Sequence, residues 1–94
     1  MAYALTIPDL VESEPVLSVS AHPDGVTFGV VIPIDETAVH LARINSNGEH
    51  LSLVILTTDA GIIALDSVFV TESTFSSNES LARITFAAQA VRFV

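Results

Sequence analysis

The clearest structural signal in the chain lies between residues 16 and 34, which read Val16-Leu17-Ser18-Val19-Ser20-Ala21-His22-Pro23-Asp24-Gly25-Val26-Thr27-Phe28-Gly29-Val30-Val31-Ile32-Pro33-Ile34. Apolar residues alternate with small or polar ones on both sides of residues 22–25, as in strands with one buried face. Pro23 presets φ at the second position of a tight turn, and Gly25 tolerates a positive φ at the fourth. The segment therefore predicts a β-hairpin.

Directly after the hairpin, the sequence predicts a short α-helix. Asp35 is a good N-terminal cap, an acidic first turn follows it, and Asn47-Gly48 can end the helix in the left-handed conformation. Three apolar residues have helical spacing, namely Ala38, Leu41 and Ala42. Residues 36–46 also fit a strand, because Asn-Gly is a strong hairpin signal. We favour the helix.

Strands are also predicted on both sides of the hairpin and helix. Residues 1–7 fit a short strand, and residues 12–15 then fit an acidic, poorly structured connection. Residues 50–57 are apolar on both faces towards their end, which is typical of a buried central strand.

The last third of the chain predicts two longer strands. Residues 62–75 are rich in β-formers, with an irregularity expected near Asp66-Ser67, and residues 81–94 form the final strand. After Ala90 the apolar residues move from even-numbered to odd-numbered positions, which indicates a bulge or a tail that leaves the sheet. Three aromatic residues fall at expected core positions: Phe28, Phe69 and Phe86.

Together these elements predict a mainly β protein. We expect an antiparallel β-sandwich or small barrel of about six strands with one short α-helix. The length of 94 residues fits a single domain over residues 1–94. Residues 1–15 are expected to form an arm that is flexible or becomes ordered at an interface.

The composition argues against several classes of function. Eleven acidic residues face only three basic ones, Arg43, Arg83 and Arg92, and the formal net charge is -8. Binding of nucleic-acid phosphates or of an anionic membrane needs clustered basic residues, so we predict neither specific nucleic-acid binding nor membrane binding. The chain contains no lysine and no cysteine, which excludes Schiff-base chemistry and disulfides.

The hydropathy is unusual for so small a chain. Half of the residues are apolar and 15% are charged, against about 25% charged in an ordinary soluble domain. Mean hydropathy is +0.61, yet no apolar run approaches the roughly 20 residues of a membrane helix. Such a chain is expected to cover part of its surface with copies of itself or with neighbouring proteins.

One segment has the look of an active-site signature, Ala21-His22-Pro23-Asp24-Gly25. It resembles the AHPDD start of zinc-dependent LmbE-like deacetylases, in which the His and an Asp bind metal. That resemblance implies a small metal-dependent hydrolase that uses His22 and Asp24. Gly25 replaces the second Asp, however, and the turn interpretation explains the same residues. His40 and His50 have no metal-binding spacing. We therefore assign no catalytic, cofactor-binding or metal residue, and we expect no enzyme activity and no cofactor.

Four further segments carry a resemblance to virus proteins: Val26–Pro33, Asp35–Thr37, Phe69–Ser77 and Leu81–Ala88. In this order, and with Arg83-Ile84-Thr85-Phe86 near the end, they resemble the small minor tail proteins of lambda-like phages and the baseplate proteins of contractile-tailed phages. Those proteins are similar to the tail-tube fold, a β-sandwich or barrel with one helix that assembles into rings.

The resemblance implies a structural protein of a bacteriophage virion, in the tail tube, tail tip or baseplate ring. Its expected partners are copies of itself in a ring and other virion proteins, and its expected location is the virion. A capsid-decorating protein of the phage head is the alternative, with residues 1–15 ordered on the shell. In a tail ring, acidic residues along the channel would repel DNA phosphates and let DNA pass.

Overall fold

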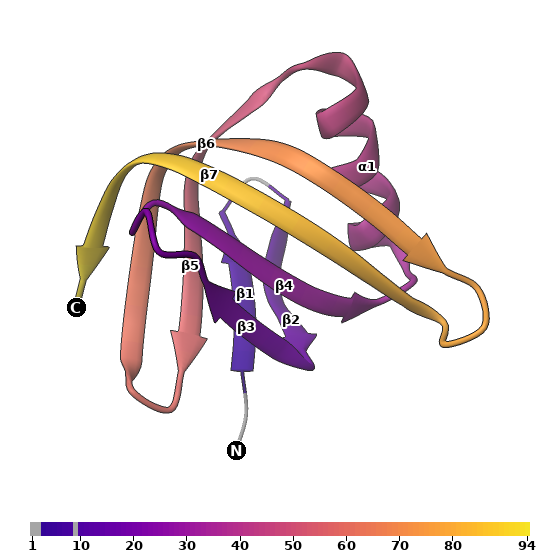
Figure 1. The fold of residues 1–94 in the computed structure, drawn as a ribbon, viewed down its shortest axis with the longest axis horizontal. Helices are drawn as coiled ribbons and strands as arrows, with labels where there is room; N and C mark the ends of the chain where they lie inside the picture. The colour runs from indigo at the N-terminus through magenta and orange to yellow at the C-terminus, as the bar shows by residue number, and fades with distance from the viewer. Residues whose placement is uncertain (1–2, 9) are drawn as a thin grey trace.

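The computed structural model describes residues 3–8 and 10–94 (Figure 1). Its elements are β1 (Tyr3–Ile7), β2 (Val11–Val16), β3 (Ser18–Ala21), β4 (Thr27–Pro33), α1 (Glu36–Asn47), β5 (His50–Thr58), β6 (Gly61–Ser76) and β7 (Leu81–Phe93). The strands form one antiparallel sheet in the order β2-β1-β5-β6-β7-β4-β3. The predicted fold class, a mainly β antiparallel architecture with one helix, is confirmed with seven strands.

The sheet curls into a nearly closed barrel because one stretch of chain forms both of its edges. β2 pairs with β1 at one edge, β3 pairs with β4 at the other, and only Leu17 separates β2 from β3. The Leu17 backbone N–H donates a 2.8 Å hydrogen bond to the Val31 carbonyl, and β2 lies against β4. We call this junction of β2, Leu17 and β4 the seam. Closure leaves fewer unpaired edge groups open to other chains.

The N-terminal segment differs from its prediction. The sequence predicts a poorly structured connection at residues 12–15 and an arm over residues 1–15, yet β1 and β2 are strands of the sheet. Leu5 and Ile7 are buried. Both predictions are therefore wrong for the described residues of this segment. The physical reason is that an acidic residue, Glu14, occupies an inward position beside Leu5, which hides the alternation on which a strand prediction depends.

The helix prediction is confirmed, including both of its ends. The Asp35 carboxylate accepts a 3.1 Å hydrogen bond from the Ala38 backbone N–H. Gly48 has a φ of +69°, and its N–H is directed to the carbonyls of the last helical turn. Ala38 and Leu41 are fully buried, where α1 packs against β6 and β7. The core under the helix holds large apolar side chains from most strands, including Leu5, Ile7, Ile32, Leu56, Leu65, Ile84 and Phe86.

Asn45 attaches the helix to β6 beside a β-bulge. The register of β6 against β7 shifts between Val70 and Glu72, and β5 does not extend this far, because its first residue pairs with Phe69. The Val70 carbonyl instead accepts a 2.6 Å hydrogen bond from Asn45 Nδ2. The Asn45 side chain therefore supplies the hydrogen-bond donor that a partner strand would otherwise supply.

Replacing Asn45 with alanine should lower the free energy of unfolding by about 1–3 kcal/mol, because the Val70 carbonyl loses its donor in a part-buried place. Urea unfolding followed by circular dichroism measures this change. Asn47→Ala is the matched control, since Asn47 is exposed at the end of the same helix. Equal losses in the two variants would contradict the role given to Asn45.

The long strands β6 and β7 bend together partway along their length (Figure 1). Ser67 has a φ of +52°, which confirms the predicted irregularity near Asp66-Ser67, although the register shift comes later in the strand. In β6 the inward side chains change from an odd-numbered position, Leu65, to even-numbered ones, Val68 and Val70. β7 changes parity too, yet it stays paired with β6 as far as Phe93. The prediction of a bulge or departing tail after Ala90 is therefore wrong, because the bend rotates both strands.

Ser67 is the position where this backbone strain is testable. A residue with a Cβ at positive φ costs about 1 kcal/mol or more, and a β-branched residue costs most. We expect Ser67→Gly to be at least about 1 kcal/mol more stable than Ser67→Val in thermal unfolding. At Ser18, an exposed position of regular strand β3, the same pair should rank in the opposite order, because Val favours strands. The same ranking at both positions would contradict the assignment.

Candidate functional site

Residues 22–25 form the predicted hairpin turn. The His22 N–H donates to the Thr27 carbonyl at 2.9 Å, and the Gly25 N–H donates to the His22 carbonyl at 3.1 Å. The Asp24 carboxylate accepts hydrogen bonds from the Val26 N–H, the Thr27 N–H and the Thr27 hydroxyl at 3.0, 2.9 and 2.6 Å. The Thr27 hydroxyl, followed by the Val26 N–H, holds the pKa of Asp24 below its usual value. The turn interpretation is confirmed.

Among the described residues, this turn does not form part of a set of three metal ligands. Both carboxylate oxygens of Asp24 serve the turn. His40 lies on α1, and His50 lies on β5 with its ring centroid 5.7 Å from that of Phe69. Across residues 3–8 and 10–94, no three His, Cys, Asp or Glu side chains are placed to hold one metal ion. The helix of the described chain is also too short to cross a membrane.

The basic residues differ in whether they have an intramolecular partner. Arg92 on β7 and Asp66 on β6 form a bidentate salt bridge, with Nε–Oδ2 at 2.8 Å and Nη2–Oδ1 at 3.1 Å. This pair lowers the pKa of Asp66 and raises that of Arg92, but both side chains are exposed, so it adds little stability. Among the described residues, Arg43 and Arg83 have no acidic group within 4.0 Å. They remain available to a partner.

An exposed apolar cluster lies where β7 ends. Ile62, Phe93 and Val94, here called the Phe93 patch, are 41%, 75% and 81% exposed. Phe93 pairs with Ile63, and the Val94 N–H donates to the Ile62 carbonyl at 2.9 Å, so the strand pairing holds the patch in place. The patch lines a shallow groove together with Thr58, Ala60, Gly61 and Ile63. A fixed apolar groove of this kind is typical of a protein–protein contact.

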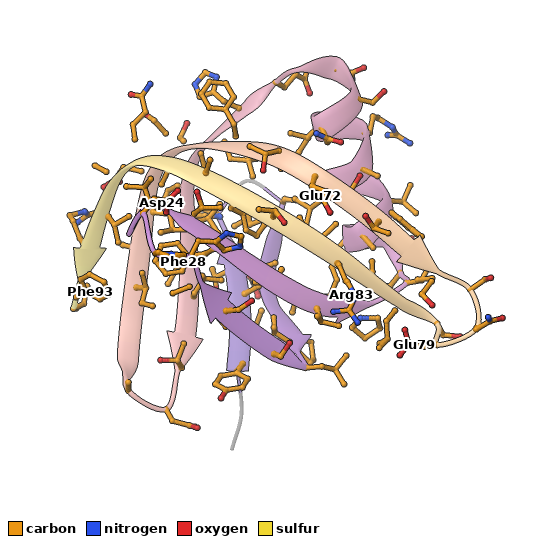
Figure 2. The ribbon with its side chains drawn as sticks, in the orientation of Figure 1. Asp24, Phe28, Glu72, Glu79, Arg83 and Phe93 are labelled. Carbon is orange, nitrogen blue, oxygen red and sulfur yellow. The ribbon has the colours of Figure 1, made fainter. Side chains whose placement is uncertain are left out.

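A second apolar surface lies at the opposite end of the molecule. Ile34 and Phe75, here called the Phe75 patch, are 39% and 41% exposed. Both flank the turn between β6 and β7, because the Ile34 N–H donates to the Ser80 carbonyl at 3.2 Å and Phe75 pairs with Ala82. That turn and the C-terminus lie at opposite ends of the view in Figure 1, and Figure 2 shows Arg83 and Phe93 correspondingly far apart. Two unlike patches at opposite ends suit a head-to-tail contact, which closes a ring or extends a filament.

Sequence reasoning places Phe69 wrongly and finds neither patch. Phe28 and Phe86 are core residues as predicted, at 2% and 0% exposure, whereas Phe69 is 42% exposed. The bend at Ser67 moves the inward positions of β6 to Val68 and Val70, and Phe69 therefore points outward. The high overall hydropathy signals that apolar surface exists, but only the strand register locates it.

Comparison with known proteins gives a fold. No protein-family model and no curated protein matches the chain. Hcp2 from Salmonella typhimurium superposes with a TM-score of 0.87 at 18% identity, covering 100% of this chain and 87% of that one. A type VI secretion system effector from Yersinia pestis gives 0.78 at 16% identity, covering 95% and 84%. Hcp3 from Pseudomonas aeruginosa gives 0.68 at 13% identity, covering 96% and 86%.

At these identities the likeness speaks for the fold. The superposition on Hcp2 includes every element, from β1 to β7, and covers 87% of the solved chain. It confirms the tail-tube-like part of the resemblance seen in the sequence. The chain has the fold of the Hcp proteins, a tail-tube-like fold.

Proposed function

We propose that this protein is a structural subunit that assembles with copies of itself into the ring of a tail-tube-like assembly. The observation that carries the proposal is the full-length superposition on Hcp2 at a TM-score of 0.87. A fold alone does not define a function, so the proposal also depends on the surface. The Phe93 patch and the Phe75 patch give the subunit two unlike apolar ends, as a ring formed from identical subunits requires.

Within this class we propose a phage virion, with the subunit in the tail tube, tail tip or baseplate. The support is the resemblance of residues 26–94 to phage tail proteins. The tube of a secretion apparatus is the second candidate, since one similar structure is described as a type six secretion system protein. The genes beside this one separate the two, because tail genes cluster in order. A capsid-decorating protein is less well supported, because the shared fold is tail-tube-like.

The proposed role involves no catalysis. This is supported by the one segment that looks like an active-site signature, residues 22–25. The Asp24 carboxylate of this segment makes hydrogen bonds within the hairpin turn. The subunit would work through its shape and its contacts.

Sedimentation velocity of the purified chain tests the proposal. We expect a species whose mass is a multiple of 9.9 kDa and whose share grows with concentration, because each subunit has one copy of each patch. Binding of many copies of the chain to a phage head would indicate capsid decoration instead. A chain that stays monomeric at every concentration and joins no tail or secretion tube would overturn the proposal.

A further inference from the structure

Glu14 is an acidic residue in an apolar place. It is 8% exposed, and its Oε1 atom is buried without a hydrogen-bond partner among the described residues. Its neighbour in the register is Leu5, and Leu5 pairs in turn with Leu56; both leucines are fully buried. An ionised carboxylate is costly in such surroundings unless it is paired. A buried, unpartnered oxygen of this kind calls for an explanation.

The group that faces Glu14 is a second carboxyl. Asp35, an exposed residue at the junction of β4 and α1, lies close enough for a side-chain hydrogen bond when one of the two groups carries a proton. β1 and β4, which also pack around β2, contain no Asp, Glu, Lys, Arg or His. Glu12 on β2 and Glu36 on α1 are exposed. Burial, then the hydrogen bond with Asp35 and its negative charge, raise the pKa of Glu14 to about 7.

The position of this pair gives it a mechanical role. Glu14 lies on β2, the strand that forms one edge of the sheet and leads through Leu17 to the other edge. Asp35 lies just after β4, against which β2 is packed. The hydrogen bond between the two carboxyls therefore joins the two sides of the seam. One shared proton draws them together, while two negative charges would push them apart.

We propose that Glu14 and Asp35 form a proton-operated clasp on the seam, which holds β2 in place while a proton is shared and loosens it when both carboxyls are ionised. Because the folded protein binds this proton more tightly than the unfolded chain, the stabilisation is complete below about pH 4.5 and is lost as the pH rises through about 7. Loosening of β2 would expose backbone groups of β1 and would change the contacts of an assembled ring. Only this last consequence depends on the proposed function.

Hydrogen exchange of the β2 amides at pH 5 and pH 8, corrected for the intrinsic exchange rates, tests the clasp. In the wild type we expect protection to fall on the order of 50-fold at the higher pH, as a carboxyl with this pKa would dictate. In Glu14→Gln we expect a change of less than about threefold. Glu12→Gln is the matched control, because it removes an exposed charge from the same strand and should keep the wild-type response. Equal protection of the wild type at both pH values, or a full loss in Glu14→Gln, would overturn the proposal.

A second measurement keeps the test decisive if Glu14→Gln fails to fold. In a carbon-13 NMR titration of the wild type, the Glu14 carboxyl should titrate near pH 7, and a midpoint near 4.5 would overturn the clasp. Asp35→Asn retains a capping side chain and should move that midpoint down. Sedimentation at the two pH values reports the ring separately. If no ring forms at either pH, the proposed function fails, whereas the exchange and titration results still decide the clasp.

Discussion

Replacing Phe93 with aspartate should separate an assembled ring into single subunits while the free energy of unfolding of the subunit hardly changes. Phe93 is 75% exposed, so it adds little to the stability of its own chain. In a contact between subunits it would be the large aromatic side chain at the centre of the Phe93 patch. Such residues carry about 2 kcal/mol or more of binding free energy, or roughly a 30-fold loss of affinity on removal. A buried unpaired charge makes the loss larger.

Sedimentation velocity and urea unfolding together measure this effect. Phe93→Leu should retain the ring, because it keeps an apolar side chain. Gln89→Asp adds the same charge at an exposed site on the same strand and should leave the ring intact. An intact ring in Phe93→Asp would show that this patch is not a contact. A large loss of unfolding free energy in that variant would show that Phe93 serves the subunit's own fold.

Phe86→Ala should lower the free energy of unfolding by about 3–5 kcal/mol. Phe86 is fully buried on β7 and pairs with Phe28 on one side and Val70 on the other. Its removal leaves a cavity between the two strands that flank β7. Because small domains are stable by only about 5–15 kcal/mol, the variant would lie near the limit of folding.

Phe69→Ala is the matched control for this prediction. Phe69 lies on the neighbouring strand β6 but is 42% exposed, so we expect a loss of under about 1.5 kcal/mol. Urea unfolding of both variants provides the comparison. Equal losses would contradict the parity change that the bend at Ser67 imposes on β6.

Features that depend on local signals could be predicted from the sequence. The hairpin of β3 and β4 is specified by a turn in which His22, Asp24 and Gly25 make the holding hydrogen bonds, and Gly25 has the expected positive φ of +79°. The helix is specified by Asp35 and Gly48 at its two ends. In both cases the deciding residues are close together in the chain, so local rules of turn and cap chemistry suffice.

Features that depend on contacts between distant strands could not be predicted. The inward position of Glu14 becomes understandable only when Asp35 is seen across the seam. The outward position of Phe69 follows from a positive φ at Ser67. The sequence indicates an irregularity near Ser67, but not that it turns Phe69 to the outer face. Each apolar patch combines residues that are far apart in the chain, such as Ile62 near the start of β6 and Phe93 at the end of β7. Periodicity within one strand holds no information about any of these.

The excess of acidic residues also has a clearer meaning in the structure. Composition suggests nearly uncharged strands with acidic rims, yet Glu12, Glu14, Asp66 and Glu72 all lie within strands. Asp66 is paired with Arg92, and Glu14 faces Asp35. The acids of the strands therefore include two groups with specific structural partners, besides Glu12 and Glu72. The other described acids lie in turns and at the start of the helix.

Cryo-electron microscopy of the purified chain tests the central claim, that this fold builds rings from copies of itself, most directly. We expect closed rings in which the Phe93 patch of each subunit meets the Phe75 patch of the next. Two-fold dimers in which a patch meets its own copy would contradict it. So would a chain that remains a 9.9 kDa monomer at every concentration tested.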